Sequence, residues 1–138
     1  MLHKLQIGLF ALLFFLDQAI PLSAAAQEAF AISNEDKRLL TKIQRDSIQY
    51  FIAHTDLETG LTRDSSRAGA PASIAATGFA LASFAIGSAH GWLSYRDAYQ
   101  RIERTLDTLE RKADQEKGFF YHFLDPKTGK RIWNSEVS

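Results

Sequence analysis

Residues 71–90 read PASIAATGFALASFAIGSAH, and this stretch decides the fold. The chain carries no Lys, Arg, Asp or Glu from Ala68 to Tyr95. Small residues alternate here with the larger apolar side chains Ile74, Phe79, Leu81, Phe84 and Ile86. A helix of this composition is apolar or small on every side, so it is either buried in a protein or placed in a membrane.

The ends of this stretch and its small residues favour burial in a protein. Pro71 suits the first turn of a helix, because that position needs no N–H donor. Gly91 suits the left-handed residue that ends a helix. Ala, Ser and Gly let helices approach closely, but they make a poor surface toward lipid. We therefore predict an inner helix over Pro71–His90, with a membrane span as the alternative.

Two other segments predict helices that are apolar on one side. Ser33 and Ser94 are each followed three residues later by Asp, which is the spacing of a capping box. Apolar residues at three- and four-residue steps then predict amphipathic helices over Asn34–His54 and Tyr95–Ala113. The pattern predicts an all-α fold of inner and outer helix pairs, which is the unit of an α/α toroid.

The stretch Gly118–Ser138 reads GFFYHFLDPKTGKRIWNSEVS and concentrates aromatic residues. Side chains alternate along Phe119–Leu124 as they do in a strand. Asp125–Gly129 has the residues of a tight turn, and Arg131–Asn134 can return as a second strand. Together they predict a short β-hairpin near the C-terminus that presents Glu136 at one end.

Aromatic rings beside a carboxylate suit sugar binding, because rings stack on the apolar faces of pyranoses and carboxylates accept hydrogen bonds from sugar hydroxyls. On this interpretation Tyr121, His122 and Trp133 form a substrate surface, and Glu136 lies next to it. The alternative is that the three Phe residues of the hairpin fill a core and Glu136 is solvated.

The adjacent pair Arg63 and Asp64 lies in the polar segment Leu61–Gly69 and also has two interpretations. An exposed pair of this kind is usually solvated or tied to backbone at a loop corner, where it contributes little. A guanidinium beside a carboxylate can instead hold the vicinal hydroxyls of a sugar or orient a second carboxylate.

Three segments of the chain resemble the glycoamylase-like family, which includes bacterial endo-β-1,2-glucanases and a region of the cyclic β-1,2-glucan synthases. The matching segments follow the order of the family. They are Thr59–Asp64, Ala72–Phe79 with Gly91-Trp92, and Gly118–Phe123 through Thr128-Gly129 to Glu136. The resemblance covers most of residues 34–138 and the N-terminal portion of the family's domain. It implies that 27–138 form the first part of an (α/α)6 toroid, truncated at Ser138.

The resemblance implies a glycoside hydrolase that acts on β-1,2-glucan or a related glucan. Hydrolysis requires two carboxyl groups, and Glu136 and Asp64 are the matching catalytic candidates. Arg63, Tyr121, His122 and Trp133 are the candidates for substrate binding. A further essential carboxylate is expected beyond Ser138, so residues 27–138 alone are expected to be inactive. The alternative function is a non-catalytic helical module that binds carbohydrate or is a structural remnant.

The first residues have the organisation of a secretory signal peptide. Lys4 precedes an apolar run over Leu5–Leu16, and Ala24–Ala26 offers a small-residue cleavage site before Gln27. An uncleaved membrane anchor is the alternative, but the run is short for a hydrocarbon core of about 30 Å. We expect residues 1–26 to be removed and the protein to be periplasmic or secreted, away from the membrane.

The composition argues against several other classes of function. Lys and Arg number 16 and Asp and Glu number 16, so no charge excess favours nucleic acid as a partner. The sequence has no Cys, and no two of its four His residues lie at metal-ligand spacing. We therefore expect no metal and no cofactor, and we make no prediction of the oligomeric state.

Overall fold

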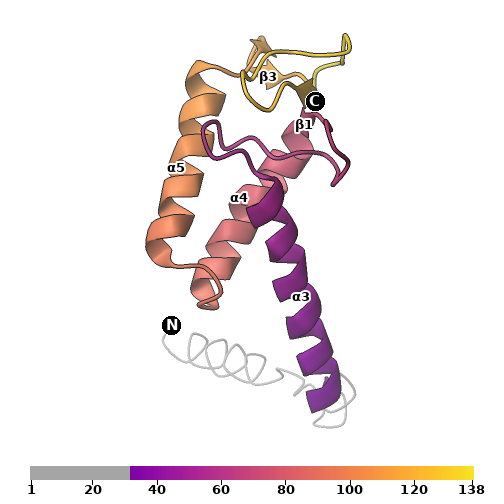
Figure 1. Cartoon of the computed structure of the whole chain (residues 1–138), viewed down its shortest axis with the longest axis vertical. Helices are drawn as coiled ribbons and strands as arrows, with labels where there is room; N and C mark the ends of the chain where they lie inside the picture. The colour runs from indigo at the N-terminus through magenta and orange to yellow at the C-terminus, as the bar shows by residue number, and fades with distance from the viewer. Residues whose placement is uncertain (1–31) are drawn as a thin grey trace, which may run out of the picture. The chain divides into compact units, whose positions relative to one another are not determined.

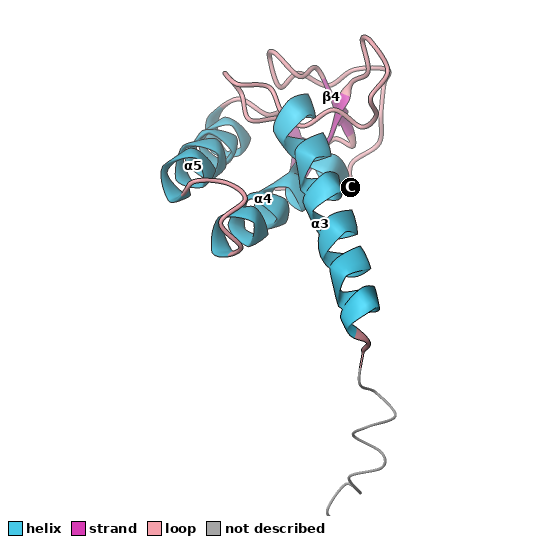
Figure 2. Ribbon diagram, turned by 60° about the horizontal axis from the view of Figure 1, so that its bottom comes forward, coloured by secondary structure: helices cyan, strands magenta, loops and turns pink. Residues whose placement is uncertain are grey.

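The computed structural model describes residues 32–138, so the predicted signal peptide and its cleavage site lie outside the described residues. Residues Arg38–Ser138 form one compact unit. The described chain has three helices, which are α3 (Asn34–His54), α4 (Ile74–Ala89) and α5 (Tyr95–Arg111) (Figure 1). It also has four two-residue strands, which are β1 (Ala72–Ser73), β2 (Gln115–Glu116), β3 (Phe119–Phe120) and β4 (Phe123–Leu124). The strands and long loops gather at one end of the helices (Figure 2).

The two amphipathic helices begin where the capping boxes predict. The Ser33 hydroxyl accepts a hydrogen bond from the backbone N–H of Asp36 at 3.0 Å, and α3 runs over the predicted residues. The Ser94 hydroxyl accepts from the N–H of Asp97 at 3.1 Å at the start of α5. Each cap satisfies a backbone donor that the first turn of a helix leaves free. Helix α5 ends at Arg111, slightly before the predicted end.

The prediction that Pro71 opens the inner helix is wrong. Ala72 and Ser73 pair as strand β1 with Leu124 and Phe123 of β4, and α4 begins only at Ile74. The Ser73 hydroxyl caps the helix by accepting from the N–H of Ala76 at 3.0 Å. An antiparallel partner from much later in the chain therefore holds these two residues extended. At its other end α4 stops as expected, with Gly91 at a φ of 69°.

The predicted C-terminal hairpin is also wrong in part, because Phe119–Leu124 is not one strand. Strand β3 pairs with β2 across Lys117 and Gly118, whose φ angles of 52° and 88° form a tight turn. Strand β4 pairs instead with β1. The return segment forms an isolated bridge between Leu124 and Arg131 rather than a strand. The aromatic stretch is thus divided between two small sheets.

The Asp125–Gly129 turn is present as predicted, and Asp56–Gly60 repeats it. In each turn the Asp carboxylate accepts hydrogen bonds from the two N–H groups that follow its next neighbour, and from a Thr hydroxyl. In each, the closing Gly has a positive φ, 74° and 73°. The sequences DLETG and DPKTG share Asp, Thr and Gly at the positions that make these bonds.

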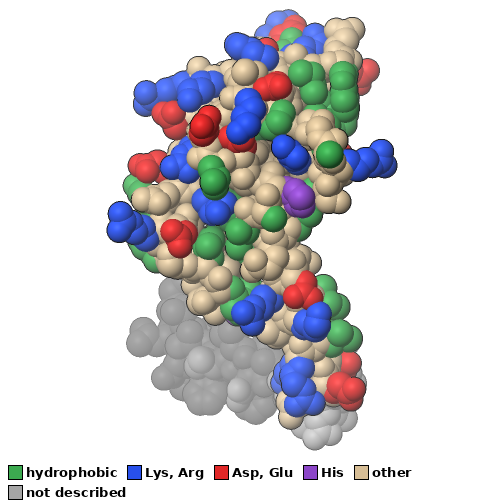
Figure 3. Space-filling view, in the orientation of Figure 1, with side chains coloured by type: hydrophobic (Ala, Val, Ile, Leu, Met, Phe, Trp, Pro, Cys, Tyr) green, Lys and Arg blue, Asp and Glu red, His purple; other side chains and the backbone are tan. Residues whose placement is uncertain are grey.

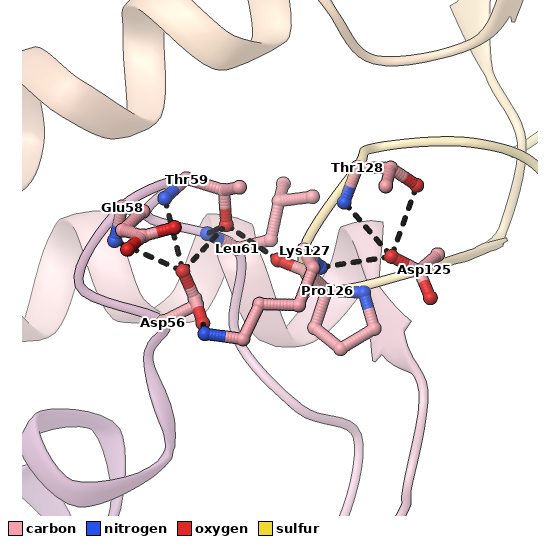
Figure 4. Close-up of polar contacts among 8 residues, drawn as sticks. All are labelled: Asp56, Glu58, Thr59, Leu61, Asp125, Pro126, Lys127 and Thr128. Carbon is pink, nitrogen blue, oxygen red and sulfur yellow. Dashed lines mark hydrogen bonds and ion pairs between the residues drawn. The ribbon is translucent and has the colours of Figure 1, made fainter.

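The two turns lie against one another and form a clasp, which we define as residues 56–60 together with 125–129 (Figure 4). The Thr59 hydroxyl donates to the carbonyl of Pro126 at 2.6 Å, and the Lys127 ammonium pairs with the Asp56 carboxylate. Thr59 is buried, and the Asp56 side chain is 10% exposed. The clasp therefore fixes the loop after α3 to the loop after β4.

The clasp and a neighbouring ion pair predict a loss of stability in acid. Partial burial works to raise the pKa of Asp56 and of Asp125, but hydrogen bonds outweigh it and lower both pKa values below the ordinary value. The N–H of Arg131 and the Lys130 ammonium lower the pKa of Asp114. Because the pKa of each carboxyl is lower in the folded state, its ionised form stabilises the fold at pH values above the unfolded pKa of about 3.9. This stabilisation is lost as the pH falls through the folded-state pKa. We expect a melting temperature that is level from about pH 5 to 7 and falls below about pH 4.

The matched variant for this pH series is Asp56→Asn, because an amide oxygen can still accept the N–H bonds of the turn while the charge is lost. Its melting temperature should be lower than wild type at pH 7 and should fall less steeply in acid. Thermal unfolding at several pH values measures both. An equal fall in wild type and variant would show that Asp56 does not contribute to the acid dependence.

Two clusters of buried side chains hold the unit together. The first lies among the strands and contains Leu61, Ala72, Ala113 and Leu124. The second lies among the helices and contains Ala80, Phe84 and Ala98, with Phe51, Ile52, Leu93 and Ile102 packed against it. The segment Leu61–Gly69 is a loop, as its polar composition predicts, but its first two residues, Leu61 and Thr62, are fully buried. Leu61 directly follows the first turn of the clasp and belongs to the first cluster.

Helix α4 is buried on one side and exposed on the other. Phe84 is fully buried, whereas Phe79 is 67% exposed and Ile86 is 45% exposed. Leu39, Leu40 and Ile43 of α3 are also exposed, and hydrophobic side chains are visible among charged ones on the face in Figure 3. The prediction that α4 is buried on all sides is therefore correct for one side of the helix and wrong for the other. Among residues 32–138, no helix has the length and hydropathy to cross a membrane.

Candidate functional site

Two hollows lie on either side of one aromatic pair, Phe123 and Trp133. The Asp64 hollow has a volume of about 390 Å³ and is lined by Asp64, Ser65, Arg67, Ala68, Gly69, Ala70, Pro71, Phe123 and Trp133. The Glu136 hollow has a volume of about 320 Å³ and is lined by His122, Phe123, Trp133, Ser135 and Glu136. The two hollows share both aromatic residues, so they adjoin.

Trp133 is the most prominent side chain of this region. It is 70% exposed, and its ring meets that of Phe123 edge-on, with centroids 5.5 Å apart and planes at 61°. Its backbone has a φ of 54°, and Asn134 follows with a φ of 53°. Positive φ is rare for a bulky residue and costs energy. The turn therefore holds the indole in the open although neither its backbone angle nor its exposure is favourable.

Asp64 reaches its hollow from a loop that its backbone fixes. Its N–H donates to the carbonyl of Pro71 at 2.8 Å, and its side chain is exposed. Burial and the charge of Asp64 together raise the pKa of the Tyr50 phenol. Tyr50 in turn donates to the carbonyl of Arg63 at 2.8 Å. A carboxylate on an anchored backbone is available to a ligand without rearrangement of the loop.

Glu136 is held by backbone pairing although it lies near the end of the sequence. Its carbonyl accepts from the N–H of His122 at 2.7 Å, and Val137 pairs with Tyr121 in an isolated bridge. The His122 ring lies 2.7 Å from the Ser138 hydroxyl, measured from Nδ1. These contacts place the Glu136 side chain, which is exposed, beside Trp133 in the same hollow.

Arg63 and Tyr121 are not among the residues that line the two hollows. The N–H of Arg63 donates to the carbonyl of His54 at 3.0 Å, and the residue bridges to Ala72. The Tyr121 hydroxyl donates to Glu116 at 3.1 Å, and the Arg131 guanidinium lies over the Tyr121 ring, 4.2 Å from its centroid. The structure thus brings together four of the predicted site residues, which are Asp64, His122, Trp133 and Glu136.

Several residues that line these hollows are absent from the predicted set, and three of them, Arg67, Phe123 and Ser135, have side chains that suit contact with a ligand. The predicted hairpin already places Phe123 close to the segment of Trp133, but the three Phe residues of the hairpin were considered only as a possible core. Arg67 lies in the same polar segment as Asp64, and its charge is the feature of the sequence that could have marked it as a candidate site residue. Ser135 has no motif around it that sequence reasoning could use.

A larger groove of about 780 Å³ lies elsewhere, between the end of α4 and one side of α5. Its lining includes Ala85, Ala89, Ala98, Ile102 and Leu106, so it has the character of a helix-packing surface. None of the candidate residues lines it. Among residues 32–138, no group of three or more His, Asp or Glu side chains could hold a metal ion.

No family model matches the chain. Over 99 residues, 70% of the chain, the sequence is 30% identical to the exo beta-1,2-glucooligosaccharide sophorohydrolase (non-reducing end) of Parabacteroides distasonis, of which it covers 14%.

The structure is similar to solved structures of the same kind. A "putative glucoamylase" from Bacteroides uniformis matches with a TM-score of 0.66 and 27% identity, over 77% of this chain and 26% of that one. The endo-beta-1,2-glucanase of Chitinophaga pinensis, in complex with sophorotriose and glucose, matches with a TM-score of 0.63 and 21% identity, over 76% and 27%. The chain spans about a quarter of these structures. It is therefore a partial match to the glucoamylase-like group that contains endo-beta-1,2-glucanases and a sophorohydrolase.

Proposed function

We propose that this chain provides part of the substrate site of a glycoside hydrolase acting on β-1,2-glucan or a related glucan. The observation that carries the proposal is the exposed Trp133, which separates two hollows that each contain a carboxylate. An indole face suits the apolar face of a glucose unit, and Asp64 and Glu136 suit its hydroxyls. The relatives support the choice of glucan, because two of them are described as acting on β-1,2-linked glucose.

The chemistry of the proposed reaction needs a pair of carboxyl groups that flank the bond to be broken. One protonates the leaving oxygen, and the other acts as a nucleophile or activates water. Glu136 and Asp64 are the candidates in the described chain, and they lie in the two hollows that share Trp133. His122 would contribute a hydrogen bond in the Glu136 hollow. Arg63 and Tyr121 would contribute to substrate binding where the segments that carry them contact the substrate.

Trp133→Ala should weaken the binding of sophorotriose, because it removes the stacking surface. A loss of about 1–3 kcal/mol is reasonable for one ring by analogy with base stacking, which corresponds to a dissociation constant roughly 5- to 150-fold higher. Isothermal titration with sophorotriose measures it. Trp92→Ala is the control, because Trp92 stacks on His90 and lines neither hollow. Equal affinity of the Trp133 variant and wild type would remove the basis of the proposal.

The second candidate is a module that binds glucan without hydrolysing it. Its supporting observation is that both candidate carboxylates are exposed in residues 32–138, whereas general acids of glycosidases lie in enclosed sites. Because residues 27–138 alone are expected to be inactive, the protein is purified from its native host. Its incubation with linear β-1,2-glucan, followed by analysis of the reducing ends, separates the two functions. Release of oligosaccharides that Glu136→Gln abolishes favours the hydrolase. Binding without release favours the module.

We also propose that the protein is exported and that its mature form begins at Gln27. The support is the sequence of residues 1–26, with a basic residue, an apolar run and a small-residue cleavage site. Sequencing of the N-terminus from periplasmic or secreted material tests this. Recovery of the protein with Met1 in the membrane fraction would contradict it.

A further inference from the structure

One buried side chain, Ser135, helps attach the turn that carries Trp133 to strand β4. Ser135 is 9% exposed, and its hydroxyl contacts both backbone groups of Phe123. It accepts from the N–H of Phe123 at 3.2 Å and donates to the carbonyl of Phe123 at 3.1 Å. A hydroxyl can do both, because it has one donor and two acceptor positions. Ser135 thus takes the place that a strand residue would occupy beside β4.

The same residue closes the turn. The N–H of Ser135 donates to the carbonyl of Ile132 at 3.1 Å, and the N–H of Ile132 donates to the carbonyl of Phe123 at 3.2 Å. Trp133 and Asn134, between the two ends of the turn, both have left-handed backbones. Strained residues of this kind persist only where the surrounding contacts over-determine them. Here those contacts run through Ser135 to Phe123.

The position of Ser135 in the sequence adds a second consequence. Ser135 lies between Trp133 and Glu136 in the sequence, and these three residues all line the Glu136 hollow. Movement of the Ser135 backbone would therefore shift the positions of the Trp133 ring and the Glu136 carboxylate together. The Trp133 ring contacts the ring of Phe123, and the Ser135 hydroxyl is hydrogen-bonded to the backbone of Phe123. Phe123 therefore holds both the ring of Trp133 and the backbone that follows it.

We infer that Ser135 is a positioning residue, which fixes the Trp133 ring and the Glu136 carboxylate in the geometry that receives a glucan. It does not touch the reacting atoms itself. This inference rests on the proposed function for the identity of the ligand, but the restraint on Trp133 can be measured without a ligand.

The experiment uses the whole chain with Trp92→Phe, which leaves Trp133 as its one tryptophan. Ser135→Ala and Ser135→Thr are made in this background, since Thr keeps the hydroxyl. Ser94→Ala is the matched control, because it removes the cap of α5 and so lowers stability without contact with the Trp133 turn. Time-resolved anisotropy reports the local rotation of Trp133, and its fluorescence reports titration with sophorotriose.

We expect Ser135→Ala to give faster local rotation of Trp133, because both hydrogen bonds of the hydroxyl to Phe123 are lost. The dissociation constant should rise by roughly threefold to tenfold, which is within the range expected for the loss of one to two hydrogen bonds. Ser135→Thr should restore both values, and Ser94→Ala should change neither. Unchanged rotation in Ser135→Ala overturns the inference, as does faster rotation with unchanged affinity. If the Trp92→Phe parent shows no saturable binding, the proposed function and the link to glucan fail together. Binding by the parent that Ser135→Ala leaves unchanged overturns the inference alone.

Discussion

Replacing Gly60 with Ala should destabilise the unit by roughly 2–5 kcal/mol, which is the sum expected for backbone strain and overpacking. Gly60 has a φ of 74°, and an added Cβ would lie 2.3 Å from the hydroxyl oxygen of Thr105 and 2.6 Å from its backbone N. Rotation of a side chain cannot relieve a contact with backbone, so the clasp or helix α5 must shift. Urea unfolding followed by circular dichroism measures the loss.

Gly69→Ala is the matched control for Gly60→Ala. Gly69 has a φ of 75°, but no atom lies within 4 Å of its added Cβ. The backbone strain is therefore nearly equal in the two variants, and the difference in their unfolding free energy isolates the contact with α5. That difference should be about 1–3 kcal/mol. Equal losses would mean that the loop moves away from Thr105 without cost.

Phe84→Ala should cost about 3–5 kcal/mol, because it leaves a cavity at the centre of the helical cluster. Phe84 is fully buried, and it joins α4 to Ala98 of α5 and to the partly buried residues around them. Total stabilities of small domains are about 5–15 kcal/mol. A unit with so much exposed apolar surface lies toward the lower end of that range, so the variant should lose its cooperative thermal transition.

Phe79→Ala removes the same side chain from the same helix at a position that is 67% exposed. It should change the free energy of unfolding by less than about 1 kcal/mol, because little apolar area returns to water. Similar losses from Phe84→Ala and Phe79→Ala would show that Phe79 is covered in solution, for example by a second molecule. Sedimentation velocity would then distinguish a dimer from a monomer.

The parts of the fold that local sequence determines could be predicted closely. Helix α3 starts and ends as expected, because the signals that determine it, the Ser33 cap and the spacing of apolar residues, are local in the sequence. The start of α4 could not be predicted, because Ala72 and Ser73 are extended through pairing with Leu124 and Phe123 and through the bridge of Ala72 to Arg63. Long-range pairing leaves no signal in a local pattern, and the same pairing divides the predicted C-terminal strand.

The candidate site was predictable by residue type but not by arrangement. Trp133 and Glu136 stand out as an aromatic residue and a carboxylate in one short segment, and both line the Glu136 hollow. Asp64 and Trp133, which line the Asp64 hollow together, come from segments far apart in the chain, so local sequence carries no signal of their approach. The contacts of Arg63 and Tyr121 with backbone and with neighbouring side chains also follow from tertiary packing.

The pairing of β1 with β4 has a consequence for the order of events during synthesis of the chain. Strand β1 leaves the ribosome directly before α4, but its partner is made only after α4, α5 and the sheet that follows them. Until Phe123 and Leu124 emerge, Ala72 has its bridge to Arg63 but not its pairing with β4, and the cluster around Leu61 lacks Leu124. The helical part of the nascent chain can thus form early, whereas the ends of both hollows are assembled last.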